Sequence, residues 1–132
     1  MLILASNPQQ ITQVEGFLET LNKQLHLDEV RYNKLLVATT EAVNNGIIHG
    51  NKRDPQKKVT LTCIKNHSTL IVRVDDEGTG VDPAALPDPL AEENLLRENG
   101  RGVFLMRSLM EEVDFEKTDR GSAVVMKMSL RD

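Results

Sequence analysis

Two pairs of short segments in which apolar and polar residues alternate constrain the fold of this chain more than any other feature. The first pair covers residues 59–64 and 70–74, and the second pair covers 113–117 and 123–130. Alternation with a period of two residues is typical of strands with one buried face, and short polar connections such as 119–121 join antiparallel neighbours. The sequence therefore predicts two β-hairpins, and it shows no repeated parallel βαβ unit.

Apolar residues recur at helical spacing in three other segments. The segment 7–25 opens with an Asn-Pro pair, and the segment 28–50 opens with an aspartate as N-cap and closes with Gly50 as the C′ glycine. The third helical segment opens at a glycine and covers 102–113. Residues 2–5 are predicted to form a first short strand, so the predicted order is β-α-α-β-β-loop-α-β-β.

This order predicts an α/β fold, a two-layer sandwich in which a mixed, mainly antiparallel sheet carries helices on one face. Residues 83–99 contain three prolines and show no sustained period. They are predicted to form a long surface loop with a short helical piece around 92–97, and loops of this length are usually functional. We expect one domain that spans 1–132.

The composition narrows the function classes. A net charge of −4 argues against direct nucleic-acid binding, which needs lysine and arginine to displace counterions from phosphates. No segment approaches the ~20 apolar residues that span a bilayer, and the N-terminus lacks a signal-peptide pattern, so we expect a cytoplasmic protein without membrane contact. Cys63 is the single cysteine and is expected to be a buried structural thiol. Because aromatic residues are scarce, we expect a flat ligand to rest on aliphatic side chains.

The predicted second helix carries an unusual set of side chains on one face. Glu41, Asn45 and His49 are spaced four residues apart, so they share a face among apolar neighbours. Gly46 lies within the same helix, where glycine costs about 1 kcal/mol relative to alanine. Oxygen ligands suit Mg²⁺, which takes one or two from the protein, and a carboxylate one turn away can orient or deprotonate a hydroxyl. A solvated stripe on a fraying helix end explains the pattern as well.

Two glycine motifs follow this helix. Asp76-Glu-Gly78-Thr-Gly80 leaves the end of a predicted strand, where glycines let the backbone approach a ligand and an aspartate can accept a hydrogen bond from an exocyclic amine. Gly100-Arg101-Gly102 immediately precedes the predicted third helix, where backbone amides make a phosphate seat and the arginine adds charge. Each motif alone is also compatible with an ordinary turn or a loop-to-helix junction.

Taken in order along the chain, these motifs resemble the nucleotide-binding boxes of the GHKL ATPase superfamily. The resemblance is closest to the small stand-alone anti-sigma-factor serine/threonine kinases, and it covers essentially the whole chain. The predicted order of elements is also similar to the sandwich of that superfamily, in which 83–99 would be the flexible lid over ATP. The residues that carry the resemblance are Glu41-x-x-x-Asn45, Asp76-x-Gly78-x-Gly80, Gly100-x-Gly102, a late Gly121-Ser122, and the runs 41–50 and 94–113.

The resemblance implies an ATP and Mg²⁺ site with divided roles. Asn45 would ligate Mg²⁺, and Glu41 would be the catalytic base or would orient the accepting serine. Asp76 would recognise the adenine amino group, supported by Ser122, which stands where the family usually has threonine. Gly78 and Gly80 would line the base, and the phosphates would be held by Gly100, Arg101 and Gly102 with the following amides of Val103 and Phe104. His49 would contact a phosphate or the lid, although a histidine near a helix C-terminus is equally often a partner of the helix dipole.

The resemblance also implies a reaction and partners. The γ-phosphate of ATP would pass to a serine or threonine of a STAS-type anti-anti-sigma protein, and the ATP-bound kinase would sequester a sigma factor. A homodimer is implied by the resemblance alone. A nucleotide-dependent binding switch with little or no kinase activity is the alternative. A fragment of a histidine kinase would carry a phosphoacceptor histidine in an upstream dimerisation hairpin, whereas His26 lies at the end of the first predicted helix. A chaperone or a mismatch-repair ATPase would need domains beyond the one expected here. Both alternatives are therefore less favoured.

Overall fold

The computed structural model describes residues 1–78 and 98–131, without the side chains of 98–101. Its helices are the 3-10 turn η1 (Pro8–Gln10), α1 (Ile11–Leu25), α2 (Glu29–Asn45), the π-helical turn η2 (Gly46–Gly50) and α4 (Glu98–Leu109). Its strands are β1 (Leu2–Ala5), β2 (Lys58–Asn66), β3 (Thr69–Asp76), β4 (Glu112–Lys117) and β5 (Ser122–Ser129). Both predicted hairpins are confirmed, since β2 pairs with β3 and β4 with β5.

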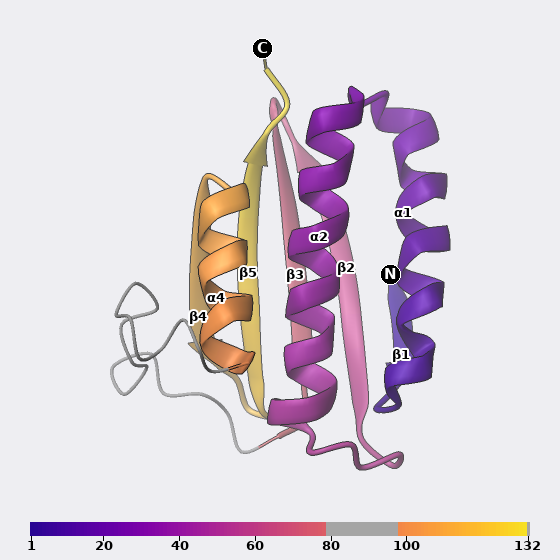
Figure 1. Ribbon diagram of the computed structural model, residues 1–132, viewed down its shortest axis with the longest axis vertical. Coiled ribbons are helices and arrows are strands. Elements are labelled where there is room, and N and C mark those ends of the chain that lie inside the picture. The colour runs from indigo at the N-terminus through magenta and orange to yellow at the C-terminus, as the bar shows by residue number, and fades with distance from the viewer. Residues whose placement is uncertain (79–97, 132) are drawn as a thin grey trace.

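The described strands form one sheet in the order β1-β2-β3-β5-β4, and the helices lie together on one of its faces (Figure 1). This arrangement confirms the predicted two-layer α/β sandwich. Every pair of neighbouring strands that the structure describes is antiparallel. A mixed, mainly antiparallel sheet was predicted, so the described part of the sheet differs from the prediction in having no parallel pair. The reason is that the two helices predicted between β1 and β2 are both present. The chain therefore reverses an odd number of times and returns antiparallel to β1.

The alternation in the strands brings apolar side chains into the layer between the sheet and the helices. Along β3, Leu70, Val72 and Val74 are buried, whereas the residues between them are partly exposed. This common core fixes the ends of the helices and strands relative to one another. Other members of the core are Leu4, Val14, Leu18, Leu35, Ala38, Val43, Ile47, Val59, Leu61, Met106 and Met126.

The second helix begins as predicted and ends differently. Asp28 caps α2, because its carboxylate accepts a hydrogen bond from the backbone N–H of Arg31 at 2.8 Å. The helix was expected to stop on Gly50 as a C′ glycine, but it widens into the π-helical turn η2. The left-handed residues that follow are Lys52 and Arg53. Single π-helical turns are rare and often lie at functional sites.

The third predicted helix is shifted toward the N-terminus. It was expected to cover 102–113, and α4 covers Glu98–Leu109. Val113 belongs to β4, where it pairs with Met126, because its apolar side chain fits both a helical and a strand period. The Gly-Arg-Gly run at 100–102 therefore lies inside the first turns of α4 rather than before it, and the predicted loop overlaps α4 at its last two residues. The rest of the predicted loop, including its helical piece, lies outside the described residues.

Cys63 lies on β2 and packs against the core, but it is half-buried rather than buried as expected. Burial raises the pKa of its thiol to about 11, so the thiol is protonated at neutral pH, as expected of a structural cysteine. Within residues 1–78 and 98–131, no helix combines the length and the apolar character that crossing a membrane requires.

Candidate functional site

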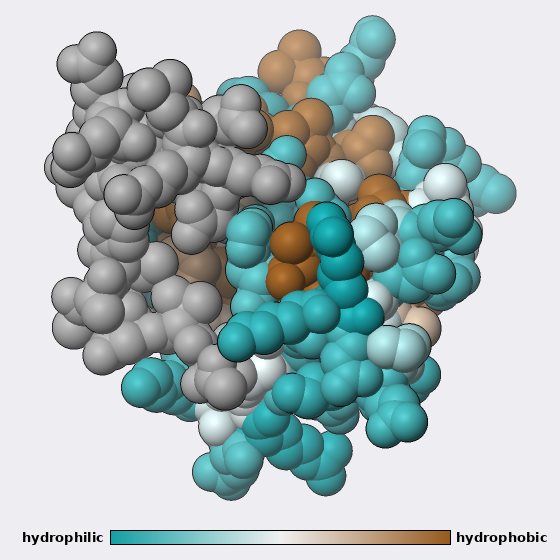
Figure 2. All heavy atoms as spheres, turned by 60° about the horizontal axis from the view of Figure 1, so that its bottom comes forward, coloured by the Kyte–Doolittle hydropathy of each residue, from teal (hydrophilic) through white to brown (hydrophobic). Residues whose placement is uncertain are grey.

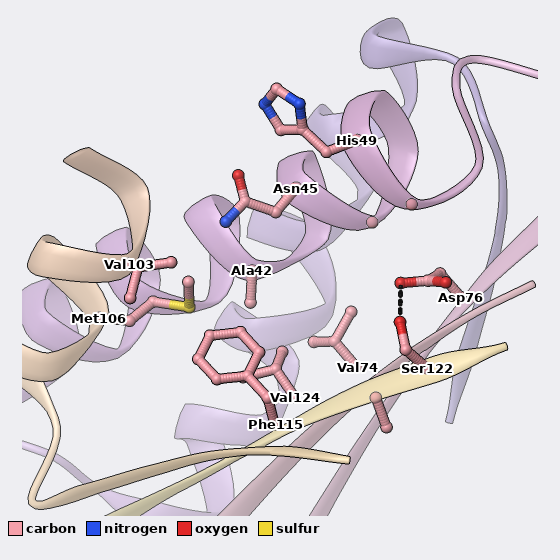
Figure 3. Close-up of a pocket in the computed structure, with 13 residues that line it drawn as sticks. Ala42, Asn45, His49, Val74, Asp76, Val103, Met106, Phe115, Ser122 and Val124 are labelled. Atoms are coloured by element: carbon pink, nitrogen blue, oxygen red, sulfur yellow. Dashed lines mark hydrogen bonds between the residues drawn. The ribbon is translucent and has the colours of Figure 1, made fainter. Parts of the chain in front are cut away.

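A pocket opens between the C-terminal part of α2, the turn η2, helix α4 and the ends of β3 and β5 (Figure 3). It contains about 590 Å³ of empty space, open solvent included, and most of the surface that lines it is apolar. Figure 2 looks toward the end of the molecule where α2 and β3 finish and shows apolar residues framed by hydrophilic ones. The lining residues are Ala42, Asn45, Gly46, His49, Gly50, Val74, Asp76, Val103, Met106, Phe115, Ser122, Ala123 and Val124.

Different parts of the pocket wall have different chemistry. Figure 3 shows Val74, Val124 and Phe115 together on the side of the sheet, so this part of the wall is apolar. The polar side chains lie around it, with Asn45 on the helix side and Asp76 at the end of β3. An apolar wall with a few fixed polar groups suits a flat ligand that carries one or two hydrogen-bonding groups.

Asp76 is held in place by tightly packed neighbours. Its Oδ1 accepts a hydrogen bond from the N–H of Gly78 at 2.9 Å. Its Oδ2 accepts one from the hydroxyl of Ser122 at 2.9 Å (Figure 3). A Cβ atom on Gly50 would lie 2.5 Å from Oδ2 of Asp76, and one on Gly121 would lie 2.2 Å from its carbonyl oxygen. Because a carboxylate offers about four acceptor positions, these two hydrogen bonds leave capacity for a donor on a ligand.

Replacing Gly50 with alanine is expected to disrupt this arrangement. The new Cβ would overlap the Asp76 carboxylate, so we expect the free energy of unfolding to fall by about 1–3 kcal/mol in urea titrations. Gly16→Ala is the matched control, because Gly16 is exposed on α1 and its Cβ would meet nothing within 4 Å. Alanine there should stabilise the protein by about 0.5–1 kcal/mol. The same response from both variants would contradict the packing interpretation.

Glu41 and Asn45 face α4 where the two helices approach closely. A Cβ atom on Gly102 would lie 3.1 Å from Oε2 of Glu41 and 3.2 Å from Nδ2 of Asn45, so the glycine leaves a small polar cradle between the helices. Among the described residues no group of three or more His, Cys, Asp and Glu side chains could hold a metal ion. The cradle fits Mg²⁺ nevertheless, because this ion takes one or two protein oxygens and its other ligands from water and phosphate.

The structure brings most of the predicted site residues together. Asn45, His49, Asp76, Val103 and Ser122 all line the pocket, with His49 exposed at its edge. Three other predicted residues, Glu41, Gly78 and Gly102, adjoin these side chains, whereas Phe104 lies on α4 and is not among the lining residues. Gly100 and Arg101 lie in the first turn of α4, where only the backbone is described. Gly80 lies outside the described residues.

Part of the wall was missed from the sequence. Phe115 gives the pocket an aromatic ring, contrary to the expected aliphatic surface, and the guanidinium of Arg107 lies 5.9 Å from the ring centroid. The alternation along β4 was the available signal, because it places Phe115 on the helix-covered face of the sheet. Ala42, Gly46 and Gly50 also line the pocket. Their four-residue spacing forms a row of small residues, which indicates that the helix approaches the sheet closely.

Comparison with known proteins gives a family profile and several sequence relatives. The profile of the histidine kinase-like ATPase domain matches residues 4–128. The anti-sigma F factor of Oceanobacillus iheyensis is 30% identical over 107 residues, which cover 79% of this chain and 72% of the relative. The anti-sigma F factor of Geobacillus kaustophilus is 34% identical over 104 residues, with coverages of 76% and 70%. That of Clostridium perfringens is 28% identical over 96 residues, with coverages of 70% and 69%.

Solved structures share the fold. The catalytic domain of the histidine kinase ThkA, in a nucleotide-free form, matches with a TM-score of 0.63 at 12% identity, over 97% of this chain and 95% of that domain. The mycobacterial sensor histidine kinase MprB matches with a TM-score of 0.59 at 12% identity, over 74% and 71%. At such identities the likeness concerns the fold alone. The profile match and the sequence relatives show that this chain belongs to the histidine kinase-like ATPase family of the GHKL group, together with the anti-sigma F factors.

Proposed function

We propose that this protein binds Mg-ATP, phosphorylates serine or threonine on a protein partner, and acts as an anti-sigma factor. The observation that carries the nucleotide part is the fixed carboxylate of Asp76 at one end of an apolar pocket that Asn45 borders on another side. An adenine ring has flat apolar faces and one exocyclic amine, so it matches an apolar wall with a single oriented carboxylate. The anti-sigma F factors among the relatives support the proposed role as an anti-sigma factor.

In this proposal the base and the phosphates bind at different elements. Asp76 accepts a hydrogen bond from the adenine amine, while the hydroxyl of Ser122 holds its other oxygen. In α4, Gly102, Val103 and Phe104 lie beyond the first turn, where helical N–H groups bond to carbonyls four residues earlier. Only the first turn of a helix offers unpaired N–H groups. The predicted phosphate contacts of these three amides therefore require that the start of α4 rearrange when a nucleotide binds.

The transfer step needs few protein groups. Bound Mg²⁺ supplies charge neutralisation on the phosphate oxygens. Asn45 would hold the ion through its amide oxygen, beside the space that Gly102 leaves open. Glu41, one turn earlier on α2, would orient the hydroxyl of the accepting serine or threonine and take its proton. The hydroxyl oxygen would bond to the γ-phosphorus as the bond from that phosphorus to the bridging oxygen breaks and ADP leaves. Because phosphoryl transfer depends mainly on positioning and electrostatics, this set is sufficient.

The anti-sigma F factors among the relatives support a sigma factor as one of the partners. We propose a STAS-type anti-anti-sigma protein as the phosphate acceptor and a sigma factor as the second partner, with no direct contact to nucleic acid. We also propose that residues 1–132 act as one domain, in line with the profile match over 4–128, that they work in the cytoplasm, and that two copies form a dimer.

A phosphotransfer assay tests this proposal. The purified protein is incubated with γ-labelled ATP, Mg²⁺ and each STAS-type protein of its host, and the label is assigned to serine or threonine by mass spectrometry. We expect Mg²⁺-dependent labelling of one STAS protein, together with capture of a sigma factor in ATP but not in ADP. ATP-dependent capture without labelling would favour the switch alternative, acid-labile phosphohistidine would favour a histidine kinase, and absence of ATP binding would refute the proposal as a whole.

A further inference from the structure

Asn51, the residue after η2, has a buried amide that ties three segments together. Its side chain is 1% exposed. Its Oδ1 accepts a hydrogen bond from the N–H of Glu77 at 2.7 Å, and its Nδ2 donates to the carbonyl of Lys58 at 3.0 Å and to Oγ of Ser6 at 2.8 Å. Both N–H bonds of the amide are therefore used. Leaving such buried groups unpaired is costly, so the amide is held in one orientation.

The amide occupies a position where β2 and β3 would otherwise continue to pair. Thr60 pairs with Asp75, so Lys58, two residues earlier, falls opposite Glu77, two residues later. Residues in a hydrogen-bonded antiparallel pair exchange both backbone bonds. Here both contacts run through side chains instead, because Asn51 links the Lys58 carbonyl to the Glu77 N–H and the Lys58 N–H donates to the Glu77 carboxylate at 2.8 Å. The Asn51 side chain thus separates the two strands beside the pocket.

We infer that Asn51 is a positioning residue for recognition of the nucleotide base, an inference that rests on the proposed function. The N–H of Glu77 belongs to the same peptide group as the carbonyl of Asp76. Its hydrogen bond to Asn51 therefore fixes the peptide plane from which the Asp76 carboxylate projects. Gly78, the residue after Glu77, packs directly against Gly50, the residue before Asn51. A Cβ atom on Gly78 would lie 1.8 Å from the carbonyl oxygen of Gly50. Gly50 and Asn51 thus form a support beneath the residues that would read the base.

Comparing ATP with purine riboside triphosphate, which lacks the exocyclic amine, tests this inference. The wild type is expected to bind ATP more tightly than the analogue in calorimetric titrations. In Asn51→Ala we expect ATP to bind about tenfold more weakly, as for one lost hydrogen bond to a charged group, while the analogue binds unchanged. Ser6→Ala is the matched control, because Ser6 belongs to the same network and donates to the Lys57 carbonyl but does not contact Glu77. It should keep the preference for ATP.

The outcomes separate this inference from the proposed function. A wild type that does not prefer ATP over the analogue refutes the base-reading role of Asp76. A preference that survives in Asn51→Ala, or equal losses for both nucleotides, overturns the positioning role alone. Asn51→Asp is a second variant that keeps an oxygen acceptor for Glu77. It should retain slow hydrogen exchange at the Glu77 amide and the preference for ATP, and rapid exchange there with an unchanged preference would also overturn the inference.

Discussion

Asn45→Ala is expected to abolish magnesium-dependent ATP binding while the fold survives. Asn45 borders the pocket, and both heteroatoms of its amide lie 3.2–3.3 Å from the place where a Gly102 Cβ would stand. Alanine removes the amide oxygen that would hold the ion, and the ion couples the protein to the phosphates. We expect ATP affinity in Mg²⁺ to fall at least about 100-fold, or ~2.8 kcal/mol. Titration calorimetry with and without Mg²⁺ measures this difference.

Asn44→Ala provides the matched control for this measurement. Asn44 precedes Asn45 on α2 and is also partly exposed, but it is not among the residues that line the pocket. Its replacement should leave the affinity in Mg²⁺ unchanged. Wild-type affinity in Asn45→Ala would refute the metal assignment. An equal loss with and without Mg²⁺ would instead assign Asn45 to packing or to a direct contact with the nucleotide.

The elements of the fold could be predicted because they depend on local patterns. The alternation of Leu70, Val72 and Val74 identifies β3 without reference to the rest of the chain. The ends of the helices could not be predicted in this way, because tertiary packing decides them, whereas the antiparallel direction of β1 already follows from the predicted order of elements. Gly50 illustrates the reason. It was expected to end a helix through its conformational freedom, but it is required because Asp76 leaves no room for a Cβ atom.

The candidate site was predictable to the extent that its residues follow a recognisable motif order. Asp76 and Ser122 were assigned to one network from their motifs, and the structure joins them by a hydrogen bond across 46 residues of sequence. Asn51 belongs to no motif, and its partners Glu77 and Ser6 lie 26 and 45 residues away. No spacing in the sequence marks such a contact. Supporting residues of this kind become visible only when the strands are in register.

Glu41→Gln is expected to bind ATP normally and to lose phosphotransfer. The variant keeps the size of the side chain, so the cradle beside Gly102 should remain, but an amide accepts protons far less readily than a carboxylate. Removing a general base typically lowers the rate by about 10²–10⁴-fold. Single-turnover transfer of labelled phosphate to the STAS-type partner measures this loss. Calorimetry under the same conditions should give wild-type ATP affinity.

Glu29→Gln is the matched control, because Glu29 is an exposed glutamate in the first turn of the same helix. It should transfer phosphate at the wild-type rate. If Glu41→Gln also transferred at the wild-type rate, the hydroxyl would not need a protein base, and the loose transition state of phosphoryl transfer would make this chemically reasonable. Catalysis would then depend on Asn45 and on the positioning of the two substrates, and the carboxylate of Glu41 would only shape the space between α2 and α4.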